Sequence, residues 1–136
     1  MKNRPEELAY FDVQYKRVEE INAKYPGAII FEGFSPNMGE WYQKIGVVIS
    51  VSDFESFHLT LADGAASGAL PVTLAWDGVD YIYPRSWLSV TCSELADRIR
   101  EINADPDREI KISEYRDFST SKFNFERVYK QFASLL

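Results

Sequence analysis

Two carboxylates with seven residues between them, Glu55 and Asp63, are the side chains of this sequence best spaced to do chemistry. They border a segment of helical character, whose first-turn N–H groups, at Phe57 to Thr60, would have no intrahelical acceptor. Such groups can hold an anion, and the helix dipole adds about 0.3–1 kcal/mol. Asp63, about one turn further in, could accept hydrogen bonds from hydroxyls attached to that anion, worth roughly 1.5–3 kcal/mol. An anion joined to vicinal hydroxyls is the shape of the diphosphate and ribose of a nucleotide.

The segments around these carboxylates are predicted to form strand, turn, helix and strand. The apolar run 47–51 predicts a buried strand, 59–67 a helix that ends at Gly68, and 71–75 a second strand. Ligands of open parallel sheets bind at the carboxyl ends of strands, against helix N-termini. On the helix, one face is expected to carry the polar or small residues and the other to pack under a sheet. The first set is Thr60, Asp63, Gly64 and Ser67, and the second is Leu59, Leu61, Ala62, Ala65 and Ala66.

The rest of the chain extends the same alternation of helices and strands. An apolar stripe at helical spacing, which ends at Pro26-Gly27, predicts a first helix; its members are Leu8, Phe11, Tyr15, Val18 and Ile21. Further strands are predicted near 28–32 and 87–91, and a short helix near 38–44. Thr91 and Glu94 have the spacing of a capping box that opens another helix. The prediction is a single, partial α/β domain over 1–136, with a Rossmann-like parallel sheet of about four strands flanked by helices.

Composition excludes several classes of protein. A formal charge of −6 argues against a nucleic-acid partner, which needs a basic face. The single cysteine, Cys92, excludes an internal disulfide framework and a cysteine-based zinc site. The longest apolar runs are far shorter than a membrane span, and residues 1–7 lack the apolar run of a secretion signal. These features favour a cytoplasmic protein without a membrane span.

The segment Ser52-Asp-Phe-Glu-Ser-Phe-His-Leu-Thr-Leu-Ala-Asp-Gly-Ala-Ala-Ser-Gly-Ala-Leu-Pro-Val72 resembles the donor-site signature of the group 1 retaining glycosyltransferases. That signature is Glu, seven residues and Glu, usually in the form Glu-Gly/Ser-Phe-Gly-Leu-x-x-x-Glu-Ala-Met-Ala-x-Gly-x-Pro-Val. The resemblance covers about 28–76 and continues more weakly through 87–90 to the final helix. It implies a two-domain enzyme that uses a nucleoside diphosphate sugar, with no cofactor and no essential metal.

The resemblance also implies roles for individual residues. Glu55 would be the catalytic residue that contacts hydroxyls of the transferred sugar, and Asp63 would hold the ribose. The implied donor-binding set is Ser56, Phe57, His58, Leu59, Thr60 and Asp63, with backbone amides of 57–59 presented to the diphosphate or sugar. The sequence departs from the signature in three places: Asp63 replaces Glu, Gly64 replaces Ala and His58 replaces Gly.

Two parts of the family pattern have no match in these 136 residues. The basic residues that clamp the diphosphate precede this stretch in the family, and the acceptor site lies in a separate N-terminal domain. The chain is therefore expected to be the C-terminal part of a longer enzyme and inactive alone. The family's strand order places two more strands between 28–32 and 47–51, so we expect these segments to pair directly or a partner chain, such as a second copy, to fill the gap. The alternative is a non-catalytic interaction module that keeps the fold without the chemistry, and the residues found at 58 and 63 favour it.

Overall fold

The computed structural model describes residues 5–135, which form two compact units that divide between Ser35 and Pro36. The first unit contains helix α1 (Pro5–Lys24), which confirms the helix predicted from the apolar stripe. The helix ends where expected: Tyr25 N–H donates to Ile21 O (2.7 Å), and Gly27 then takes a positive φ of 77°. Four members of the stripe are exposed in the described residues, namely Leu8, Phe11, Tyr15 and Ile21.

The strand predicted at 28–32 is wrong, because these residues form no strand. The backbone of Ile29 is bonded to a side chain instead of a neighbouring strand: its N–H donates to Asn22 Oδ1 (2.9 Å), and its carbonyl accepts from Asn22 Nδ2 (2.8 Å). Ile30 and Phe31 are 71% and 68% exposed, so the apolar run has no core to enter. An apolar run without a partner strand lacks the hydrogen bonds that define a sheet. Of the two expected arrangements, direct pairing of 28–32 with 47–51 is not found in the sheet of the described residues, and a partner chain in the gap stays a prediction.

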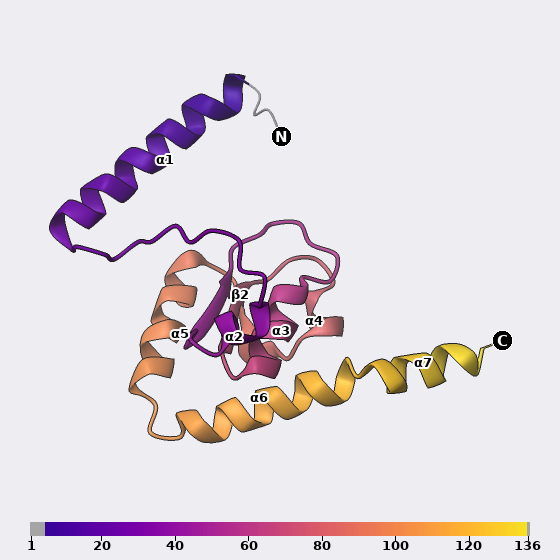
Figure 1. Ribbon diagram of the computed structural model, residues 1–136. Coiled ribbons are helices and arrows are strands. Elements are labelled where there is room, and N and C mark those ends of the chain that lie inside the picture. The colour runs from indigo at the N-terminus through magenta and orange to yellow at the C-terminus, as the bar shows by residue number, and fades with distance from the viewer. Residues whose placement is uncertain (1–4, 136) are drawn as a thin grey trace. The chain divides into compact units, whose positions relative to one another are not determined.

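The second unit contains a three-stranded parallel sheet with the strand order β1-β2-β3 (Figure 1). Its strands are β1 (Val47–Ser50), β2 (Leu70–Leu74) and β3 (Leu88–Ser89), paired so that Val47 lies opposite Leu70 and Thr73 opposite Leu88. The protein is therefore mixed α/β, with three parallel strands rather than the four expected. The last strand is shorter than predicted, because the 3₁₀ turn η1 (Arg85–Trp87) precedes it and a helix begins at Cys92.

Three helices of this unit contact the strands and flank the sheet: α3 (Leu59–Ser67), α5 (Cys92–Ala104) and α6 (Arg108–Lys122). The unit also contains α2 (Met38–Tyr42), α4 (Val79–Ile82) and α7 (Phe125–Ala133). Leu95 and Ile102 of α5 pack with Leu70 and Val72 on one face of β2. Val48, which is in register with Pro71, packs with α3 on the other face, because alternate residues of a strand point to opposite faces. No helix among residues 5–135 is long and apolar enough to cross a membrane.

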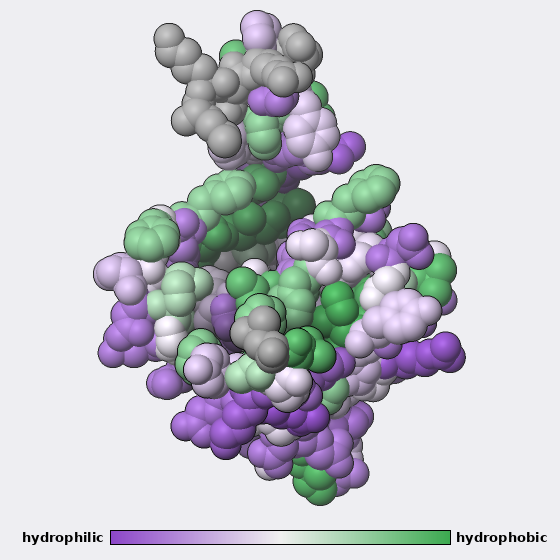
Figure 2. Space-filling model, turned by 90° about the vertical axis from the view of Figure 1, so that its right-hand side faces the viewer, coloured by the Kyte–Doolittle hydropathy of each residue, from purple (hydrophilic) through white to green (hydrophobic). Residues whose placement is uncertain are grey.

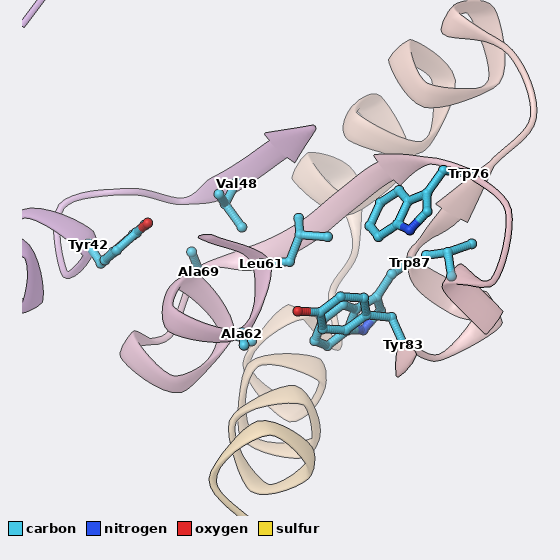
Figure 3. Packing of buried hydrophobic residues seen from close by; sticks show 10 residues of the cluster. Tyr42, Val48, Leu61, Ala62, Ala69, Trp76, Tyr83 and Trp87 are labelled. Atoms are coloured by element: carbon cyan, nitrogen blue, oxygen red, sulfur yellow. The ribbon is translucent and has the colours of Figure 1, made fainter. Parts of the chain in front are cut away.

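The core on the α3 side is rich in aromatic rings. Leu61 of α3 points between Val48 and Trp76, and Tyr83 lies against Trp87 (Figure 3). The rings of Tyr83 and Trp87 are stacked, with centroids 5.2 Å apart and planes at 22°. Trp76, Tyr83 and Trp87 are all buried, so these aromatic side chains anchor their loops in the core.

Many apolar side chains nevertheless lie at the surface, where they form green areas among hydrophilic ones (Figure 2). On α7 they recur at helical spacing: Phe125, Val128, Tyr129 and Phe132 are all exposed, as is Leu135 just after the helix. The final helix is thus amphipathic, and its apolar face is not buried in this chain.

The capping box is confirmed in part. Thr91 accepts the N–H of Glu94 (3.2 Å) at the start of α5. The carboxylate of Glu94 returns to the N–H of Val90 (2.6 Å), one residue before the expected donor.

Candidate functional site

The turn between β1 and α3 carries an unusual backbone conformation at His58. This residue has φ 56° and ψ 63°, in the left-handed region, and it is the non-glycine residue of the described chain with a positive φ. A left-handed residue with a Cβ costs roughly 1–2 kcal/mol. The position is the one at which the sequence signature carries glycine. The fold therefore imposes a glycine-like turn at the N-terminus of α3 and holds a histidine in it.

The side chain of His58 is fixed by two neighbours. Its Nδ1 lies 2.8 Å from Oε1 of Glu55, and its ring centroid lies 5.8 Å from that of Trp76. Both members of the pair are partly sheltered, with 16% of the His58 side chain and 28% of the Glu55 side chain exposed. Hydrogen bonds from Ser52 and then His58 lower the pKa of the Glu55 carboxyl, and partial burial opposes them. Glu55 is thus held as a carboxylate at the carboxyl end of β1.

Tyr83 is hydrogen-bonded to the same turn. Its hydroxyl lies 2.9 Å from the carbonyl oxygen of Phe57 and 3.1 Å from that of His58, and it donates to this pair of acceptors. Burial, with the charge of Asp63 as a second cause, raises the pKa of Tyr83 to about 12. The hydroxyl therefore stays protonated and keeps its hydrogen bond throughout the physiological range of pH.

The first turn of α3 offers backbone donors where the sequence predicts them. Leu61 N–H donates to His58 O (3.1 Å), whereas the N–H groups of Leu59 and Thr60 meet no backbone carbonyl within residues 5–135. Leu59 and Thr60 are both exposed residues. A free pair of N–H groups at a helix N-terminus can bind an anion.

The division of α3 into two faces differs from the prediction at three positions. Gly64, expected on the polar face, is buried, while Leu59 and Ala66, expected under the sheet, are exposed. A Cβ on Gly64 would lie 2.7 Å from Cγ1 of Val48, well inside contact distance. Gly64 therefore allows α3 to approach β1 closely, and this gives a physical reason for the glycine that the signature does not have.

Asp63 is exposed and lines a hollow of about 210 Å³ between α2 and α3. The other lining residues are Met38, Gly39, Tyr42, Ala66 and Ser67. The predicted donor-binding residues therefore lie on one continuous turn and helix: Ser56 is exposed, Phe57 and His58 are partly buried, and Asp63 follows one turn after the free N–H groups. Glu55 is adjacent to His58, while Asp63 opens into a separate hollow.

Three residues of the site were not predicted from the sequence: Ser52, Trp76 and Tyr83 contact Glu55, His58 or the turn that carries them. Ser52 precedes Glu55 by three residues, a spacing that local reasoning could have found. Trp76 and Tyr83 belong to the segment after β2, and only the parallel alignment of the strands brings it to this turn.

In the described residues, no group of three or more His, Cys, Asp or Glu side chains could hold a metal ion. The predicted donor-binding residues contain no lysine or arginine. No protein-family model, curated protein or solved structure matches the chain.

Proposed function

We propose that this chain is the Rossmann-like, nucleotide-sugar-binding part of a retaining glycosyltransferase. The parent enzyme would transfer a sugar from a nucleoside diphosphate donor to an acceptor hydroxyl. The observation that carries the proposal is the left-handed backbone of His58 between Glu55 and α3. The signature carries glycine at this position, and the backbone of this chain at His58 is one that glycine adopts without strain. Agreement between a sequence signature and an unfavourable backbone conformation supports a functional reason for that conformation.

Each group of the turn then has a chemical role. The N–H groups of Leu59 and Thr60 would receive the diphosphate, whose departing charge they stabilise as the glycosidic bond breaks. Asp63 would accept hydrogen bonds from the ribose hydroxyls in the hollow beside α2. Glu55, kept ionised by Ser52 and His58, would hold hydroxyls of the transferred sugar. No metal is required for these contacts.

Two neutral N–H groups and two carboxylates bind a diphosphate weakly, because the ligand itself is anionic. Basic groups and the acceptor would come from another part of the parent enzyme. We therefore expect this chain alone to bind a nucleoside diphosphate sugar with a dissociation constant on the order of 1 mM, which corresponds to about 4 kcal/mol, and to have no transferase activity.

A second candidate function is a non-catalytic interaction module, and a specific observation favours it. His58 Nδ1 lies 2.8 Å from the Glu55 carboxylate. The imidazole that replaces glycine therefore already contacts the carboxylate that would bind the donor sugar. A donor would have to displace this contact. The exposed apolar face of α7 is also what an interaction module offers to a partner.

Nucleotide titration of ¹⁵N-labelled protein separates the two functions. UDP, UDP-glucose, ADP-glucose and GDP-mannose are added, and the amide signals of 55–63 are followed. The transferase proposal expects saturable shifts on this turn for at least one nucleotide, weakened about tenfold in Asp63→Asn but unchanged in the matched surface control Asp117→Asn. Absence of shifts up to about ten times the expected dissociation constant would favour the interaction module.

A further inference from the structure

A second cavity, of about 370 Å³, lies at the carboxyl ends of β2 and β3 and shares only Trp76 with the site described above. Strand β2 ends at Leu74, and residues 75–80, which follow it, line the cavity. Val90, which follows β3, lines it as well. Ala75 N–H donates to Ser89 O (2.9 Å) and holds the two strand ends together. The carboxyl edge of a parallel sheet is where open α/β folds bind ligands, and the volume falls in the lower range of small-molecule sites.

The cavity has an apolar wall and a charged rim. Val79 and Leu88 are buried or half-buried and form the wall with Val90. Asp77, Asp80 and Arg85 line the rim; each is exposed, and none has a hydrogen-bond or ion-pair partner in the described part of the chain. The rim therefore presents planar acceptors and a planar donor, with one net negative charge from two carboxylates and one guanidinium.

Trp76 supplies an independent observation. It lines the cavity and is only 6% exposed, yet its indole Nε1 is a buried donor without an acceptor in residues 5–135. Buried donors in folded proteins are nearly always paired, with protein, water or ligand. The described residues provide no acceptor for this donor, and Trp87 Nε1 in the same core is a second donor of this kind.

We propose that this cavity binds a neutral sugar ring. Hydroxyl groups both donate and accept hydrogen bonds. The hydroxyls of one ring can therefore donate to the carboxylates of Asp77 and Asp80 and accept from the guanidinium of Arg85. The C–H face of the ring suits the apolar wall, and the ring brings no charge to be desolvated. A phosphorylated or carboxylate-bearing ligand is disfavoured because carboxylates outnumber the cation on the rim.

This site is separate from the one proposed for the donor, although the ring of Trp76 lies 5.8 Å from that of His58. The inference does not depend on glycosyl transfer, since it rests on Trp76 and on the rim of the cavity. A sugar in this cavity lies one strand away from the turn that carries Glu55.

The experiment follows ¹⁵N–¹H spectra of the whole chain during titration with methyl α-D-glucopyranoside, methyl α-D-mannopyranoside and methyl β-D-galactopyranoside. Glucose 6-phosphate and leucine serve as anionic and zwitterionic comparisons. We expect saturable shifts of the amides of 75–80 and 88–90 and of the Trp76 indole N–H for at least one glycoside, with a dissociation constant on the order of 1 mM. Asp77→Asn/Asp80→Asn and Arg85→Gln should each weaken binding at least about tenfold, while Asp117→Asn should not change it.

Four outcomes would overturn the inference: no glycoside shifts these signals, leucine or glucose 6-phosphate binds more tightly, the shifts fall on 55–63 instead, or the rim variants bind as well as the parent. Because the three rim side chains are exposed and unpaired, their replacement leaves the core unchanged, and an unaltered spectrum elsewhere verifies this. Nucleotide binding at 55–63 is read from different signals, so either proposal can fail while the other stands.

Discussion

His58 Nδ1 lies 2.8 Å from Oε1 of Glu55, and the backbone that brings the two side chains together is left-handed at His58. The contact between His58 and Glu55 and the backbone strain therefore belong to one turn. Three contacts hold His58 in its unfavourable left-handed conformation. Its ring contacts Glu55 and Trp76, and its carbonyl oxygen accepts from the Tyr83 hydroxyl. Substitutions at His58 can separate the effect of the side-chain contact from the effect of the backbone strain.

The pair of variants His58→Gly and His58→Ala isolates the backbone strain. Both remove the imidazole and its contact with Glu55, but only alanine keeps a Cβ at φ 56°. We expect His58→Gly to be more stable than His58→Ala by about 1 kcal/mol, measured by urea unfolding at neutral pH. Equal stability of the two variants, or greater stability of the alanine variant, would mean that the turn is not left-handed in solution.

Glu55 should titrate below the ordinary range of a glutamate carboxyl, because Ser52 and then His58 hydrogen-bond to its ionised form. A lowered folded-state pKa contributes stability above the unfolded pKa, and this stability is lost as pH falls through the folded value. Carboxyl-carbon NMR titration of the wild type and of Ser52→Ala checks the direction, and the Glu55 midpoint should rise in the variant. The matched surface control is Glu114→Gln, which should leave the Glu55 midpoint where it was.

Tyr83 should resist ionisation, since burial raises its pKa to about 12 from an ordinary value of 10.0. The unfolded chain releases this proton first, so the stability contribution is complete below pH 10 and is lost as pH rises toward 12. Tyr83→Phe removes that part of the alkaline loss and also removes the hydrogen bond to the turn, at a cost of about 0.5–1.5 kcal/mol at neutral pH. Tyrosinate absorbance and urea unfolding at several alkaline pH values provide the measurement; identical alkaline loss in both proteins would contradict the assignment.

Gly64→Ala should destabilise the protein although alanine is the better helix former by about 1 kcal/mol. The new Cβ would lie 2.7 Å from Val48 Cγ1, so the predicted cost of overpacking is about 1–3 kcal/mol. A double-mutant cycle with Val48→Ala, which makes room for the methyl group, tests the cause. The two substitutions should be coupled favourably by at least about 0.5 kcal/mol, and additivity would show that α3 does not approach β1 at this residue.

Local sequence signals determined much of this protein. Gly68 at the end of α3, Thr91 and Glu94 at the start of α5 and the apolar period of α1 each act over a few residues, and these helices appear where predicted. The turn carrying Glu55, the free amides of α3 and the exposed position of Asp63 follow from the same local chemistry.

Tertiary contacts decided what local signals could not. The run 28–31 is apolar enough for a strand, but a strand needs a neighbour, and Asn22 takes the hydrogen bonds of Ile29 instead. Gly64 lies buried against Val48, a contact that no helical period reveals. Trp76 and Tyr83 reach His58 only because β1 and β2 are parallel and end at the same edge of the sheet. Spacing along the chain fixes which residues share a turn, whereas the register between strands fixes which turns meet.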